Sequence, residues 1–201
     1  MSGIIAQNSG RHTGLVKASS GGGGVWNLIL TQTASASSTI DFTSDIDSTY
    51  DEYVFKFIDI HPSDDSSNLG FQVNVSGQSG FNETVTSTFP HAWHNEADSI
   101  QGVAYHADFD QAQGTAYQPL ARELGNGADE STAGTLHLFN PSSTTFVKHF
   151  YSCFSGHVHD DAEKSSYMAG YFNVTGAIDE VSFKMSGGEI DAGQISLYGI
   201  S

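Results

Sequence analysis

The 201-residue sequence contains a single cysteine, four prolines and only seven Lys and Arg residues. With Cys153 alone, the chain can form neither an internal disulfide framework nor a cysteine-rich zinc module. No apolar run approaches the roughly 18 residues that a membrane-spanning helix requires, and the N-terminus lacks the charged and apolar regions of a secretion signal. We therefore expect synthesis in a host cytoplasm, no classical export and no membrane insertion.

Basic residues are also too few to balance the acidic ones. Seven Lys and Arg residues face 23 Asp and Glu residues, which gives a formal net charge of −16. Binding to a phosphate backbone generally requires a Lys/Arg surface, so this balance argues against a nucleic-acid partner.

The acidic residues are unevenly distributed along the chain. The first forty residues contain no Asp or Glu, and the opening segment runs into four glycines, Gly21 to Gly24. This composition predicts an N-terminal attachment arm at 1–24 with a flexible Gly-rich joint, followed by an acidic domain at 25–201. The arm's apolar and basic residues are its candidate partner-binding residues: Ile4, Ile5, Arg11, Leu15, Val16 and Lys17.

Alternating apolar and polar residues dominate the rest of the sequence. Phe71, Val73 and Val75 alternate with polar residues, which is the pattern of a half-buried strand. In residues 53–60 the apolar phase slips, which predicts a β-bulge or a strand that crosses between sheets. Only residues 119–125 have a helical pattern, of barely two turns. About ten strands separated by turn residues predict an all-β fold, an antiparallel β-sandwich or jelly roll.

Three segments resemble accessory virion proteins of marine tailed bacteriophages, including phages of cyanobacteria. They are the opening MSGIIAQNSGRHTGLVKA, the internal STIDFTSDIDSTYDEYVFKF and the ending FKMSGGEIDAGQISLYGI. The resemblance implies a short arm followed by a β-sandwich like those of tail fibres, receptor-binding proteins and capsid decoration proteins. It implies virion localisation and other virion proteins, of the capsid or tail, as partners, and it transfers no catalytic residue.

One histidine motif has the spacing of a metal site. His157, His159 and Glu163 match much of the HxHxxxE motif of cupins, but no later histidine supplies the fourth ligand. In some phage fibre tips, one HxH from each of three chains surrounds an iron on the threefold axis, so these residues are candidate metal ligands only in an oligomer. The alternative is a solvated loop, and we expect no cofactor. A second cluster, His91 with His94 and Glu96, is interpreted as a polar loop packed over the sheet.

Aromatic residues offer a different kind of site, because β-sandwiches often bind sugars by stacking a ring on a pyranose face. The candidate glycan-binding residues are Trp93, Tyr105, Tyr117 and Tyr167. No pattern of a catalytic nucleophile or of a paired acid and base is found, so we predict a protein that is not an enzyme.

These observations lead to a first functional hypothesis and two alternatives. The hypothesis is a virion structural protein, anchored by its arm, that projects a β-sandwich as a head decoration or tail-fibre-like module, most simply as a homotrimer or another homo-oligomer. The alternatives are a receptor- or carbohydrate-binding β-sandwich on the tail, with a host surface glycan as partner, and a metal-dependent jelly-roll enzyme.

Overall fold

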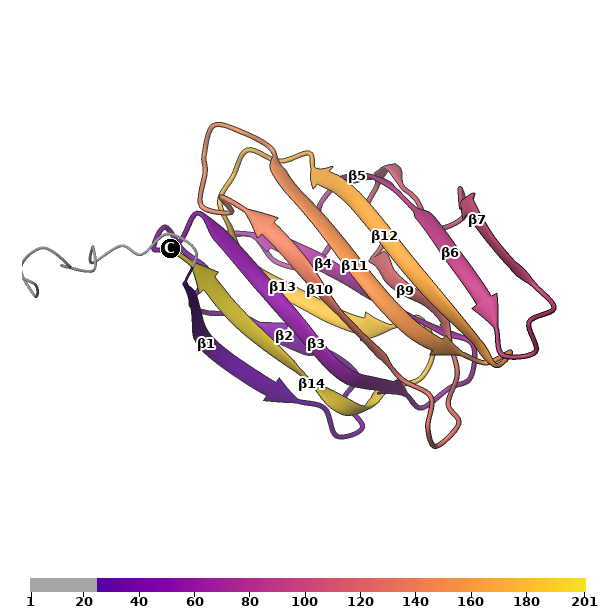
Figure 1. Ribbon diagram of the computed structural model, residues 1–201. Coiled ribbons are helices and arrows are strands. Elements are labelled where there is room, and N and C mark those ends of the chain that lie inside the picture. Colours follow the sequence, from indigo (N-terminus) through magenta and orange to yellow (C-terminus); the bar gives the residue numbers. More distant parts are fainter. Residues whose placement is uncertain (1–24) are drawn as a thin grey trace, which may run out of the picture.

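The computed structural model describes residues 25–201, which form fourteen antiparallel strands in two facing layers (Figure 1). The front layer has the order β1-β14-β3-β10-β11-β12-β6-β7, and β5 continues the line of β6 along β12 with β8 beside it. The strands of this layer are β1 (Trp26–Thr33), β3 (Glu52–Pro62), β5 (Val85–Thr88), β6 (Pro90–Asn95), β7 (Gln101–Tyr105), β8 (Ala112–Gly114), β10 (Thr132–Phe139), β11 (Lys148–Val158), β12 (Ala162–Phe172) and β14 (Ile190–Ile200).

The back layer has the order β9-β4-β13-β2. Its strands are β2 (Ile40–Phe42), β4 (Ser67–Val75), β9 (Gln118–Leu124) and β13 (Ile178–Met185). A single residue pair, Val158 with Leu124, joins β11 to β9 and connects the two layers along one side. The predicted antiparallel β-sandwich is confirmed for the described residues, whereas the predicted arm at 1–24, with its six candidate residues, lies outside them.

Aromatic side chains fill the space between the layers. Phe183 of β13 is fully buried, and its ring packs edge-on against Phe57 of β3 with centroids 5.1 Å apart. Phe71 of β4 makes a similar contact with Phe150 of β11, also at 5.1 Å. Edge-to-face pairs of this kind add to the free energy gained by burying the rings, so they hold the two layers in register.

The predicted irregularity in 53–60 is present as a bulge in β3. The register of β3 against β10 shifts between Phe57 and Ile60, and Asp59 adopts a φ of 52°. Gly193 of the neighbouring strand β14 lies so close to Asp59 that a Cβ atom on Gly193 would approach its carbonyl oxygen to 2.4 Å. The bulge therefore explains both the change of apolar phase in the sequence and the glycine beside it.

Two expectations about individual strands are wrong. Residues 119–125 are not helical, because β9 covers most of them and pairs with β4. The described residues also contain no helix that could span a membrane. The polar face of β4 was expected to be exposed, yet Gln72 is fully buried. Its side-chain amide donates to backbone carbonyls of Glu83, Thr115 and Ala116, so loops that the alternation pattern cannot reveal cover this face.

Candidate functional site

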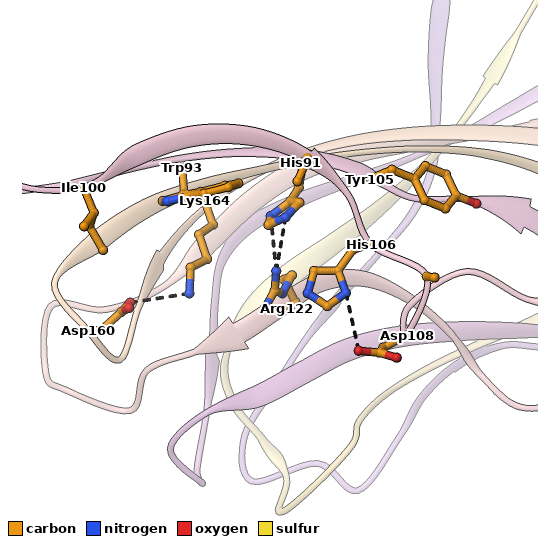
Figure 2. Close-up of a pocket in the computed structure, with 11 residues that line it drawn as sticks. His91, Trp93, Ile100, Tyr105, His106, Asp108, Arg122, Asp160 and Lys164 are labelled. Atoms are coloured by element: carbon orange, nitrogen blue, oxygen red, sulfur yellow. Dashed lines mark hydrogen bonds and ion pairs between the residues drawn. The ribbon is translucent and has the colours of Figure 1, made fainter.

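The front layer extends two strands beyond the back layer, and a pocket lies beneath this extension. The β6–β7 hairpin continues the front layer past β12, whereas β9 ends the back layer on that side. The pocket has a volume of about 530 Å³ and lies between the hairpin and β9 (Figure 2). We refer to it as the hairpin pocket.

Trp93 forms one wall of the hairpin pocket. It lies on β6 directly opposite Gly102 of β7, and a Cβ atom built on Gly102 would lie between 2.5 and 3.1 Å from three atoms of the indole ring. Such nearly equal distances mean that the indole lies flat over Gly102, where no other residue type would leave room for it. Trp93 also lines the pocket, so Gly102 supports the indole at the edge of the cavity.

Two buried cations form the floor of the pocket. Lys164 of β12 is the register partner of Trp93, and Arg122 reaches the cavity from β9. Their side chains are only 9% and 8% exposed. Both cations bind one carboxylate, that of Glu123: Lys164 Nζ lies 2.5 Å from Glu123 Oε2, and the Arg122 guanidinium contacts the other oxygen. Although burial alone raises the pKa of Glu123, the hydrogen bonds from Lys164 and Arg122 outweigh it, so the pKa is lowered and the carboxylate remains charged.

His91 lies between Arg122 and Trp93 (Figure 2). Its ring stacks on Trp93 with centroids 4.9 Å apart, and its Nδ1 lies 3.2 Å from an Arg122 terminal nitrogen. Burial, followed by repulsion from Arg122 and His106, lowers the pKa of His91 to about 4. The imidazole is therefore neutral at neutral pH and can accept a hydrogen bond from the guanidinium.

Arg122 still has hydrogen-bonding capacity that the described residues do not use. Its Nε is buried and has no acceptor among them. The guanidinium also lies over the Phe109 ring, 4.7 Å from the centroid, which fixes its plane. Two further acidic residues, Asp160 and Asp108, lie at the mouth of the pocket, where their side chains are 43% and 90% exposed.

The four aromatic glycan candidates occupy different places. Trp93 and Tyr105 both line the hairpin pocket, but Tyr105 is at its rim, with its ring turned away from Arg122 and its hydroxyl donating to Asp110 (Figure 2). Tyr117 is half-buried, donates to Ser182 and packs under Lys184. Tyr167 is exposed on the outer face of β12, opposite Cys153.

The candidate metal ligands do not form one set. His157 ends the outer face of β11, and its ligand atoms lie near Glu130 and Asp161, the only potential metal-binding group among residues 25–201. His159 lies in the following turn, where its Nδ1 is 3.3 Å from the Glu123 carbonyl oxygen. Glu163 pairs with His157 across the strands but accepts a hydrogen bond from Ser165.

Sequence reasoning missed most of the hairpin pocket. Arg122 was assigned to a helical turn, and His91 was assigned to a loop although it lies on β6. Lys164 has no local signal, because only the pairing of β12 with β6 brings it beside Trp93. Gly102, opposite a tryptophan on a neighbouring strand, is a signal that a correct strand alignment could have used.

Comparison of the chain with protein-family models, with curated proteins and with solved structures finds no match in any of the three. The residues of the hairpin pocket therefore provide the basis for a functional proposal.

Proposed function

We propose that the protein is a non-enzymatic carbohydrate-binding β-sandwich, and that its arm attaches it to a phage virion. The observation that supports sugar binding best is the Trp93 indole, which lies flat on Gly102, stacks with His91 and lines a pocket with polar walls. Pyranose rings stack on such a platform through their C–H groups, while charged and amide side chains hydrogen-bond their hydroxyls.

The polar groups around Trp93 suit sugar hydroxyls. Arg122 and Lys164 supply donors, Asp160 and Asp108 supply acceptors, and neutral His91 can do either. A cavity of about 530 Å³ is large enough for one or two sugar rings.

The test is binding of the full chain to a glycan array that carries hexose, hexosamine, hexuronic acid and sulfated oligosaccharides. We expect binding that Trp93→Ala reduces at least tenfold and that Tyr167→Ala leaves unchanged, since Tyr167 is an exposed ring away from the pocket. A Gly102→Val variant should also reduce binding, because the added side chain would displace the indole. Equal binding by the wild type and Trp93→Ala would contradict the proposal.

A structural role in the virion is the second candidate, and the edge strand β1 favours it. Trp26 and Leu28 are 46% and 59% exposed on this outermost strand of the front layer. The strand carries no charge in a strongly acidic protein, and its outer edge is unpaired among the described strands. Uncharged, exposed edges of this kind are sites where a strand from another chain can add.

Deletion of residues 1–24 separates attachment from folding. We expect the shortened protein to fold with a melting temperature within about 2 °C of the full chain, because the hydrophobic residues from Ala34 to Leu197 already form one contiguous buried core within residues 25–201. It should lose incorporation into the virion. Unchanged occupancy in purified particles would instead assign attachment to the sandwich, and Leu28→Glu would then test β1.

A further inference from the structure

We propose that the hairpin pocket selects an acidic sugar, whose carboxylate binds at Lys164 and Arg122 while its ring stacks on Trp93. This inference rests on the proposed carbohydrate-binding function and specifies the chemical class of the ligand. It depends on the charge at the floor of the pocket, which is positive although the protein as a whole is strongly acidic.

Basic residues are scarce in the described chain, yet two of them meet in this pocket. Residues 25–201 contain only five, Lys56, Arg122, Lys148, Lys164 and Lys184, against 23 acidic residues. Lys164 and Arg122 come from different layers and both are more than nine-tenths buried. Burying two like charges together is costly, so we expect the pair to have a function beyond stability.

The local charges leave the floor of the pocket positive. The buried cations share one carboxylate, that of Glu123, behind them. Asp160 also approaches Lys164, at 3.5 Å, but it lies at the mouth with Asp108, where both carboxylates are exposed to solvent. Water screens exposed charges far more strongly than buried ones, so the cations dominate the potential at the floor.

The donors on the floor are not fully used. Within residues 25–201, Arg122 Nε has no acceptor, and an Arg122 terminal nitrogen faces the neutral ring of His91 rather than an anion. Buried donors of a guanidinium are usually satisfied, most strongly by a carboxylate. An anionic group from the ligand would supply the missing acceptor.

The positions of these residues fit a single sugar residue. Lys164 is the register partner of Trp93, so its side chain rises from the sheet beside the indole. Paired positions on neighbouring strands lie about 5 Å apart, which is close to the width of a pyranose ring. A ring stacked on Trp93 can therefore direct a carboxylate at its edge toward Lys164 and Arg122.

The experiment compares each acid with its own neutral derivative. Oligosaccharides of galacturonic, glucuronic and mannuronic acid, each with its methyl ester, are titrated into the full chain by calorimetry, with a sulfated galactan oligosaccharide as a further anion. We expect at least one acid to bind tenfold or more tightly than its ester. Lys164→Gln should reduce this ratio to about one, whereas Lys184→Gln, which removes the same charge at Tyr117 outside the pocket, should preserve it.

A second variant keeps the inference testable if Lys164→Gln fails to fold. Asp160→Asn removes an exposed carboxylate that competes with the ligand's carboxylate for Lys164, so it should raise the ratio of acid affinity to ester affinity several-fold. Equal affinity for acid and ester, with binding still dependent on Trp93, would overturn this inference and leave the proposed function intact. Preference for the sulfated sugar over every uronate would overturn the carboxylate assignment. Absence of binding to every saccharide would overturn the proposed function itself.

Discussion

The imidazole of His91 lies 3.2 Å from the guanidinium of Arg122, and burial together with this contact makes the stability of the protein depend on pH. Burial and the cation lower the pKa of His91 to about 4, whereas an unfolded chain restores its ordinary value of 6.5. Between these values the unfolded state binds more protons, so folding stability decreases as the pH falls from about 6.5 to about 4.

We expect His91→Gln to flatten this part of the stability–pH curve. The contribution of His91 is on the order of 3 kcal/mol, because its pKa falls from 6.5 to about 4 and each pKa unit corresponds to about 1.4 kcal/mol. Urea denaturation at half-unit pH intervals measures it, with His94→Gln, an exposed histidine paired with Asp98, as the control. Parallel curves for His91→Gln and the wild type would show that the contact has no such effect.

The carboxylate of Glu123 holds two cations in place, so its neutralisation should destabilise the protein. Glu123→Gln leaves Lys164 and Arg122 without their shared anion, and we expect a loss of about 2–4 kcal/mol in the free energy of unfolding. Because the pKa of Glu123 is lowered in the folded protein, its contribution is present above the ordinary value of 4.5 and is lost as the pH falls below it. Glu163→Gln, at an exposed position outside this network, should cost less than about 0.5 kcal/mol.

Phe183 is expected to be one of the most sensitive positions of the core. Its ring contacts four other buried rings, those of Phe42, Phe55, Phe57 and Phe71, across both layers. Phe183→Ala should cost about 3–5 kcal/mol, since it removes these contacts and leaves a cavity. Thermal denaturation checks this against Phe146→Ala, whose ring is 69% exposed and whose loss should change the melting temperature little.

Removal of divalent ions should leave the protein unchanged. In the group of His157, Glu130 and Asp161, Asp161 is exposed and the Glu130 carboxylate already accepts a hydrogen bond from the backbone of Gly127. Only one nitrogen ligand remains, which is fewer than most transition-metal sites provide. We expect EDTA to shift the melting temperature by less than about 1 °C. A larger decrease, abolished by His157→Ala, would show that the group binds a structural metal.

The sequence revealed the elements of the fold more readily than their partners. Residues such as Val181 and Phe183 alternate with polar residues because one face of their strand is buried, and this alternation can be read from the local sequence alone. Gln72 departs from that pattern because a distant loop covers it. Arg122 was assigned to a helical turn because Pro119 and Gly125 flank its segment as they would flank a short helix, and pairing with β4 overrides this local signal.

The candidate site could be predicted only in part, for a related reason. Trp93 was identified by its residue type, but its partners Lys164 and Arg122 lie 71 and 29 residues away in the sequence. Their proximity follows from the order of the strands and from the packing of the two layers, and neither has a local signature. The proposed metal ligands His157 and His159 are separated because β11 ends at Val158, so His159 lies in the turn that follows.

The pairing of Trp26 with Ile200 places the start of β1 and the end of β14 at one corner of the sandwich, whereas β7 closes the opposite side of the same layer (Figure 1). Seven strand spacings separate β1 from β7, a width of about 34 Å. A particle that holds the protein by its N-terminal side would therefore keep the hairpin pocket clear of its own surface. Neighbouring copies could then engage one polymer together, so that weak individual contacts would add up to firm adhesion.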